Sequence, residues 1–359
     1  MLIKKTFDRR TFLKFSAIVG ASIGTPLYSF LEWRLANADT RPINSAISSA
    51  GLASSWNVQG KAATDKFAQF LGVNVSWFDG EHDDQKHLAI FEQIATQHYD
   101  FVAVQPNGIG ILTAPITTIA KTTPVIDMDT LIAPLDQLRS MGVLTLISCD
   151  NVTLSEAVVT SIVEKMGGKG QIARTGGQQG HTGAQGRHQG FLNVLKNYPD
   201  ITVVDDEPGD WDTTKTAQIW QTLLTRYPNI SGCFCDNDDM ALAAQKVIAD
   251  AGKDQQVFVG GIDGMTPAIQ AIVDGKMVAT ARNSATRVHA WAMVAGAYAA
   301  TVGLEQARKE LPFFVLADGP VILSDVDIND AFKDTPWKLK AYGLSTAPGQ
   351  VWIENQLFF

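Results

Sequence analysis

The sequence predicts an α/β fold with two doubly wound, Rossmann-like lobes, each a parallel sheet covered by helices on both faces. Short, fully apolar segments alternate with longer amphipathic ones, which is typical of buried parallel strands and their crossover helices. The alternation runs twice, over roughly 43–149 and 152–283. A length of 359 residues, with 45% hydrophobic and 18% charged residues, suits two globular domains and excludes disorder and a coiled coil.

The elements of the first repeat follow from local periodicity. Apolar and β-branched runs of four to six residues predict strands, and apolar residues at helical spacing predict helices. The expected strands are 43–48, 73–78, 101–105, 124–128 and 143–147, and the expected helices are 58–71, 85–97 and 113–120.

The second repeat continues the same pattern. Its first expected helix, 155–166, ends at two consecutive glycines, which stop helices. The remaining expected helices are 189–197, 214–226, 240–251 and 267–274, and the expected strands are 171–174, 202–206, 232–235, 257–260 and 278–281.

A glycine-rich segment at 176–187 interrupts this repeat. Its spacing of glycines suggests a phosphate cradle, but it lacks Gly-Lys-Ser/Thr and does not match the dinucleotide fingerprint. We therefore predict a flexible binding loop there.

The charges divide the chain into a basic start and an acidic body. Residues 1–38 hold six cations and two anions, which leaves 23 positive and 35 negative charges, a net of −12, over the rest. An acidic body argues against nucleic acid or a membrane surface as a partner, because both require a basic face.

The basic start has the layout of a secretory signal. The sequence DRRTFLK at 8–14 resembles a twin-arginine export motif, an apolar stretch follows at 15–31, and Ala36-Asn37-Ala38 matches a signal-peptidase site. We predict an export signal over 1–38, cleaved after Ala38, and a periplasmic mature protein. The alternative is an uncleaved anchor, which Gly20, Gly24 and Pro26 disfavour because they interrupt a segment already short for a bilayer.

Polar and aromatic side chains follow the predicted strands. Ligands of doubly wound sheets bind beyond the carboxyl ends of the strands, so these side chains are expected to converge. Carboxylates, amides and a guanidinium beside tryptophans suit a hydroxyl-rich ligand. The segments concerned are 54–57, 105–107, 127–129, 149–151, 176–187, 236–239, 263–264 and Asn283.

Several motifs together carry a family resemblance. They are PVIDMD at 124–129, SCDN at 148–151, RHQGF at 187–191, DNDDMAL at 236–242 and GIDG at 261–264. In this order and spacing, the chain resembles the type I periplasmic sugar-binding proteins of ABC importers, the ribose/galactose-binding class, over about residues 43–330.

The resemblance implies ten ligand-binding residues. Trp56 and Trp211 would be aromatic platforms from the two lobes, and Asp129 would accept hydrogen bonds from adjacent hydroxyls. Arg187 would reach a ring oxygen or hydroxyl, and Asp263 would close the far side. The remaining five are Asn57, Gln105, Asn151, Asn237 and Asn283.

Several positions depart from the ribose-like pattern. Thr130 stands where that pattern has an arginine, and Cys149 stands where a small hydroxyl residue is usual. Two tryptophans replace phenylalanines, and Asn283 stands where a glutamine is common. The resemblance therefore indicates a monosaccharide or polyol without naming it.

The same resemblance implies the domain organisation. Three crossovers near 148–151, 281–284 and 317–321 would join a lobe of 39–149 plus 284–317 to a lobe of 150–283 plus 318–334. The tail 335–359 lies outside the resemblance, and packing on a lobe or serving a partner both stay open for it.

The implied mechanism is a clamp that closes on its ligand, without cofactor, metal or covalent chemistry. The closed monomer would dock on the membrane permease of an ABC importer. The alternatives are a ligand-presenting component for a chemoreceptor or sensor kinase and, less favoured, a secreted carbohydrate-active enzyme that uses Asp129 and Asp263.

Four other features have competing interpretations. Cys233 and Cys235 would share one strand face as buried thiols rather than bind metal. The acidic clusters 127–129 and 236–239 are interpreted as hydrogen-bond acceptors for a sugar rather than a catalytic or cation site. The histidines expected to be solvated are His82, His87 and His98, while His181 and His188 stay open.

Overall fold

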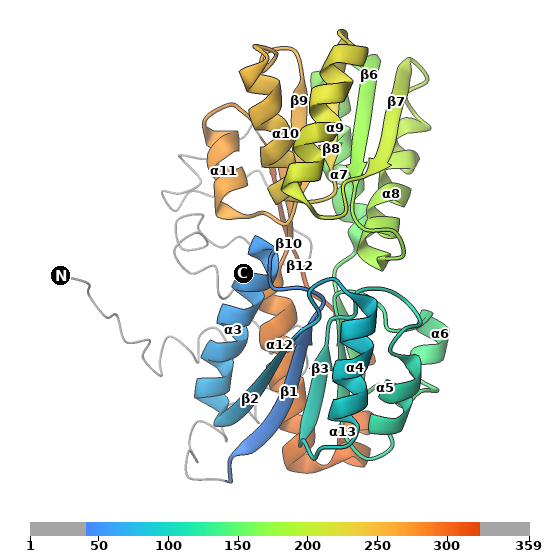
Figure 1. The fold of residues 1–359 in the computed structure, drawn as a ribbon, viewed down its shortest axis with the longest axis vertical. Helices are drawn as coiled ribbons and strands as arrows, with labels where there is room; N and C mark the ends of the chain where they lie inside the picture. Colours follow the sequence, from blue (N-terminus) through green and yellow to red (C-terminus); the bar gives the residue numbers. More distant parts are fainter. Residues whose placement is uncertain (1–40, 324–359) are drawn as a thin grey trace, which may run out of the picture.

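The computed structural model describes residues 41–323 of the chain. Strands and helices alternate through this region and form two six-stranded sheets stacked end to end (Figure 1). The predicted export signal and the tail 335–359 lie outside the described residues. No helix of the described region is long and apolar enough to cross a membrane.

The first sheet is parallel throughout, with strand order β11-β5-β4-β3-β1-β2. With the helices packed on it, we call it lobe one. Its strands are β1 (Ile43–Ser49), β2 (Val73–Asp79), β3 (Phe101–Val104), β4 (Val125–Met128), β5 (Thr145–Ser148) and β11 (Phe314–Leu316). Its helices are α3 (Ser55–Leu71), α4 (Asp84–Ile94), α5 (Thr113–Ile119), α6 (Leu135–Leu138), α12 (Ala285–Val302) and α13 (Leu304–Glu310).

The second sheet has strand order β12-β10-β9-β8-β6-β7 and is parallel except for the edge strand β12. With its helices, we call it lobe two. Its strands are β6 (Gly170–Gly176), β7 (Ile201–Pro208), β8 (Ile230–Cys235), β9 (Phe258–Ile262), β10 (Ala279–Asn283) and β12 (Asp318–Leu323). Its helices are α7 (Asn151–Lys165), α8 (Thr182–Leu195), α9 (Thr213–Arg226), α10 (Asp238–Asp250) and α11 (Thr266–Val273).

The chain passes between the lobes three times. It leaves lobe one between β5 and α7, returns between β10 and α12, and leaves again between β11 and β12. Two doubly wound sheets joined by three crossovers confirm the predicted fold class.

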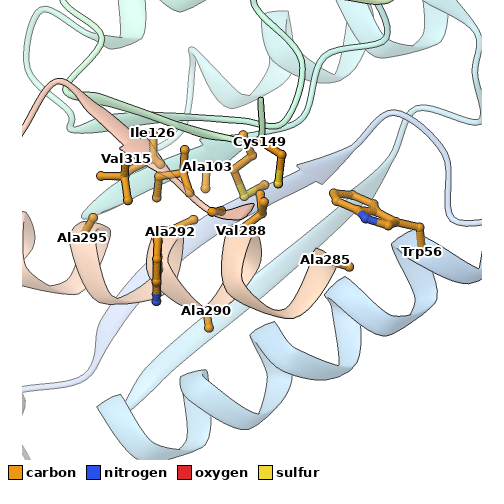
Figure 2. Packing of buried hydrophobic residues seen from close by; sticks show 14 of the residues in the cluster. Trp56, Ala103, Ile126, Cys149, Ala285, Val288, Ala290, Ala292, Ala295 and Val315 are labelled. Carbon is orange, nitrogen blue, oxygen red and sulfur yellow. The ribbon is translucent and has the colours of Figure 1, made fainter. Parts of the chain in front are cut away.

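Helix α12 forms the centre of lobe one. It packs against α3 and against β3 and β4, and nearly all of its residues are buried. Figure 2 shows Val288, Ala292 and Ala295 directed at the sheet residues Ala103 and Ile126. Small side chains let the helix lie close to the strands, which is the dense packing expected of a protein interior.

The predicted flexible loop at 176–187 is wrong in its second half, because α8 begins at Thr182. A Cβ on Gly186 would lie 2.9 Å from the Cβ of Asn151, and a Cβ on Gly190 would lie 2.4 Å from the Val152 oxygen. These glycines let α8 pack tightly on α7. Their purpose is close helix contact rather than flexibility.

Candidate functional site

A pocket lies between the lobes, at the carboxyl ends of both sheets. Its cavity volume is about 40 Å³. About 10–15 Å³ of such space holds one water molecule, so this pocket is a small one. It is lined by Ala50, Ser54, Trp56, Asn57, His82, Gln105, Asp129, His181, Arg187, Trp211, Asn237, Asp263 and Asn283.

Nine of the ten sequence-predicted site residues line this pocket. The exception is Asn151, the first residue of α7. Its side-chain oxygen accepts a hydrogen bond from Nε of Arg187 at 2.8 Å. Asn151 therefore holds the guanidinium from behind.

The lobe-one wall has a fixed amide and carboxylate. Oε1 of Gln105 accepts hydrogen bonds from Oγ of Ser49 at 3.1 Å and from the amide of Ala50 at 3.3 Å. The Gln105 amide nitrogen consequently faces Asp129 and donates to its Oδ2 at 3.0 Å. The other carboxylate oxygen, Oδ1 of Asp129, accepts only a long hydrogen bond of 3.5 Å from the side-chain nitrogen of Asn283 within the described residues, so it can accept a further one.

The lobe-two wall is organised by Arg187. Its guanidinium donates to Asn151, to the backbone oxygen of Asp236, and to Oδ1 of Asp263 at 3.3 Å. Burial raises the pKa of Asp263 well above its usual range, although the nearby guanidinium acts in the opposite direction. The pocket thus contains a rigid cation beside a carboxyl group that resists ionisation.

The two tryptophans come from opposite lobes. Nε1 of Trp56 donates to the backbone oxygen of Asn283 at 2.8 Å, which fixes the ring in α3. Trp211 follows β7 and lies 5.6 Å from the guanidinium of Arg187 and 5.0 Å, edge to face, from the ring of His181. Trp211 is half-buried: it lines the pocket and also packs against the hydrophobic core of lobe two.

Two amides in the pocket have unused hydrogen-bonding capacity. The side-chain nitrogen of Asn283 lies 3.5 Å from Asp129 and 3.5 Å from Asp263, so it stands between the two carboxyl groups. Within residues 41–323, Oδ1 of Asn283 and Oδ1 of Asn57 are buried without a hydrogen-bond partner. A buried polar atom without a partner is costly, and a bound hydroxyl would supply one.

The sequence-based interpretation of the histidines needs correction. His82 is half-buried and lines the pocket. His87 is buried inside lobe one, where Nε2 lies 2.7 Å from Oγ of Ser48, and burial lowers its pKa to about 4. Only His98 is exposed as predicted. The helical period places His87 on the inner face of α4, a signal that was present in the sequence.

His181 is a pocket residue that the sequence left open. It precedes α8, and its Nε2 lies 2.7 Å from Oγ1 of Thr130 in lobe one. Burial lowers the pKa of His181 to about 4, so the imidazole is neutral at physiological pH. By contrast His188 lies outside the pocket and pairs with Asp206 at 2.8 Å.

Most of the two acidic clusters serve the fold instead of the pocket. Asp236 accepts from Arg174 at 2.6 and 2.9 Å and from the amide of Gly177 at 2.8 Å. Asp238 accepts from the amide of Met265 at 2.7 Å, and burial raises its pKa to about 7. The predicted sugar-acceptor role is therefore wrong for these two carboxylates.

The two strand cysteines are buried thiols. The Sγ atoms of Cys233 and Cys235 lie 3.8 Å apart on the same face of β8, as their spacing predicts. Among the described residues no group of three or more potential ligands is placed to hold a metal ion.

These features define a class of protein. Two lobes, each with an aromatic ring and hydrogen-bonding groups, meet over a small polar pocket. Such a site binds a compact hydroxyl-rich molecule by enclosing it between the lobes.

A family model for the periplasmic binding protein domain matches residues 46–305, and the chain belongs to this family. It is 31% identical over 231 residues to the D-allose-binding periplasmic protein of Escherichia coli, covering 63% of this chain and 74% of that protein. It is 30% identical over 221 residues to the ribose import binding protein of Bacillus subtilis, covering 61% and 69% of the two chains.

Solved structures agree with this fold. An ABC transporter solute-binding protein from Mycobacterium smegmatis with bound glycerol matches with a TM-score of 0.71 and 26% identity. The match covers 79% of this chain and 95% of that one.

Proposed function

We propose that this protein binds a monosaccharide or a polyol in the pocket between its lobes and delivers it to the membrane permease of an ABC importer. The observation that carries the proposal is the convergence of Trp56 and Trp211, from opposite lobes, on a pocket lined by Asp129, Arg187 and Asp263. The relatives named above, which bind allose or import ribose, support the class of ligand.

In this proposal each group has a task. The indole rings cover the apolar C–H faces of the ligand, and Asp129 and the free amide oxygens accept hydrogen bonds from its hydroxyls. Arg187, held from behind by Asn151, donates to a ring oxygen or hydroxyl. Charge-assisted hydrogen bonds contribute about 1.5–3 kcal/mol each, so a few of them with two rings can reach micromolar affinity, about −8.2 kcal/mol.

The mature protein, in this proposal, is a periplasmic monomer released by cleavage after Ala38. We assign residues 39–149 with 284–317 to one lobe and residues 150–283 with 318–334 to the other, of which 39–40 and 324–334 lie outside the described residues. Binding involves no covalent change, and incubation with an oligosaccharide or an aryl glycoside yields no product.

Calorimetry with a panel of pentoses, hexoses and polyols tests the proposal. We expect at least one of them to bind, and we expect Trp211→Ala and Asp263→Ala to weaken that ligand about tenfold or more, since each removes a pocket contact. If both variants bind the best ligand unchanged, the site is misplaced. If no sugar or polyol binds the mature chain, the function is wrong.

A further inference from the structure

Hydrogen bonds join the two lobes directly on both sides of the pocket. On the first side, Ser55 of α3 donates to Asp239 of α10 through its amide, at 3.0 Å, and through Oγ, at 2.7 Å. On the second side, Thr130 bonds to His181 at 2.7 Å. We call these pairs the first and the second clasp. In Figure 1, α3 and α10 lie on one side of the molecule and α8 on the other.

The first clasp is the stronger of the two on physical grounds. The amide of Ser55 is one of the donors that the first turn of a helix leaves unsatisfied, and the carboxylate of Asp239 satisfies it from the other lobe. A carboxylate at a helix N-terminus also gains from the helix dipole. The local cap, Ser54, serves a different amide, that of Asn57 at 3.2 Å.

The second clasp has an additional bond beside it. The amide of Leu131 donates to Oγ1 of Thr182 at 3.1 Å, so both residues after Asp129 contact the start of α8. Neither Thr130 nor Thr182 lines the pocket.

Apart from His181, which lines the pocket, the clasp residues neighbour the pocket walls without being part of them. Ser55 precedes Trp56, and Asp239 follows Asn237 by two residues. Neither Ser55 nor Asp239 lines the pocket. Formation of the first clasp therefore aligns the pocket wall of lobe one, beside Trp56, with the pocket wall of lobe two, beside Asn237.

We propose that the first and second clasps stabilise the closed arrangement and set the rate at which a bound ligand escapes. Ser55, Asp239 and Thr130 act as positioning residues, because their bonds join lobe to lobe and leave the pocket surface to the ligand. The inference rests on the proposed function only where it concerns ligand escape. Closure itself is independent of which ligand binds.

The experiment measures closure by single-molecule energy transfer between dyes on the two lobes. Cysteines introduced at the exposed positions Glu92 and Gln255 carry the dyes, and the native cysteines are buried. The variants are Asp239→Ala, Ser55→Ala, their combination and Thr130→Val. Asp250→Asn is the matched control, because it removes one carboxylate from the exposed end of the same helix α10.

We expect Asp239→Ala to shorten the lifetime of the closed state about tenfold, since it removes both bonds of the first clasp. Ser55→Ala keeps the amide donor and has a smaller effect. The double variant equals Asp239→Ala, because Ser55 has no partner to lose once the carboxylate is gone. Thr130→Val shortens the lifetime severalfold, and Asp250→Asn leaves it unchanged.

Stopped-flow release of the sugar or polyol that binds best gives the second readout. The dissociation rate is expected to rise in the same order as the closed-state lifetime falls, while thermal unfolding shows that each variant is folded. Unchanged lifetimes in Asp239→Ala, or purely additive effects of Asp239→Ala and Ser55→Ala, overturn the first clasp. If the chain binds no sugar or polyol, the proposed function fails, and the lifetimes without ligand still decide the inference.

Discussion

Three pocket residues have positive φ angles, which residues other than glycine rarely adopt. The φ angles are 63° at Asp129, 62° at Trp211 and 129° at Asp263. Backbone hydrogen bonds hold the two carboxyl residues in place, from Asp129 to Ile147 and from Asp263 to Ala281, both at 2.8 Å. Such strain costs about 1–3 kcal/mol per residue and gathers at functional sites, which supports these residues as binding groups.

Gly177→Ala is expected to weaken ligand binding about tenfold without unfolding the protein. A Cβ at Gly177 would lie 2.1 Å from the ring of Trp211, so the indole must move from its place over the pocket. Titration calorimetry with the best ligand measures the loss. Gly108→Ala is the control, because its Cβ meets nothing closer than 3.5 Å. Equal affinities in the two variants would refute the assignment of Trp211.

At the scale of elements, the contact between α7 and α8 positions Arg187. Helix α8 carries Arg187, and α7 begins at Asn151, which holds its guanidinium. Oγ of Ser155 on α7 also donates to the backbone oxygen of Arg187 at 2.6 Å. The helix pair therefore supports this proposed binding residue from two directions.

Gly190→Ala should destabilise the fold by about 1–3 kcal/mol, because the added methyl group overpacks the interface of α7 and α8. Its Cβ would lie 2.4 Å from the backbone oxygen of Val152. Urea unfolding gives the free energy. Gln185→Ala, on the exposed face of α8, should leave it within about 0.5 kcal/mol of the wild type. A neutral Gly190→Ala contradicts the packing argument.

The contact between α4 and β1 should make folding sensitive to acid. His87 has a pKa of about 4 in the fold, against 6.5 for an ordinary histidine, because it is buried. As the pH falls, His87 takes up a proton in the unfolded chain before it does so in the folded protein. The contribution of neutral His87 to the free energy of unfolding is thus fully present above about pH 6.5 and is lost as the pH falls towards 4.

Replacement of His87 by Gln, which can still bond to Ser48, should reduce the fall in the free energy of unfolding between pH 6.5 and 4 by the share that His87 contributes. His181 and His289, whose pKa burial also lowers to about 4, keep their own shares. Urea melts across this range measure the fall. His98→Gln, an exposed change near the same helix, serves as the comparison. A His87→Gln variant with the slope of the wild type would show that other groups carry the acid sensitivity.

At the scale of the whole molecule, the lobes are interleaved along the chain. The elements α12, α13 and β11 belong to lobe one, although they follow most of lobe two in the sequence. Helix α12 packs on the sheet of lobe one at its centre (Figure 2). Each lobe is thus tied to the other by three segments of chain. This connectivity permits hinge motion and prevents independent drift of the lobes.

A ligand that bridges the lobes must stabilise the whole fold. At a free concentration one hundred times Kd, we expect the free energy of unfolding to rise by about 2.7 kcal/mol. Urea melts followed by tryptophan fluorescence, with and without the best ligand, measure this rise. The Asp263→Ala variant should require a proportionally higher ligand concentration. The absence of any rise at saturation would exclude binding to the native state.

Local patterns were sufficient for most of the elements. The alternation of short apolar runs and amphipathic segments predicts β1 to β10 and most of the helices between them, because both periodicities are local properties of the chain. It did not predict α6 or the elements after β10, which are α12, α13, β11 and β12. Most of the nine predicted site residues share one pocket because they lie at or just after the carboxyl ends of strands, and those ends of the two sheets face each other. Arg187 lies within α8 and reaches the pocket from there. The prediction of a flexible loop at 176–187 was wrong over the start of α8, since glycine spacing alone does not distinguish a flexible loop from a closely packed helix.

The sequence by itself determined the alternating order of the elements, and with it two sheets whose polar ends face each other. Only the tertiary structure decided which carboxylates face the pocket. The carboxylates of Asp236 and Asp238 accept hydrogen bonds from Arg174 and from backbone amides, whereas Asp129 and Asp263 line the cavity. The partner of a buried charge comes from a distant part of the chain, so no local pattern can specify it.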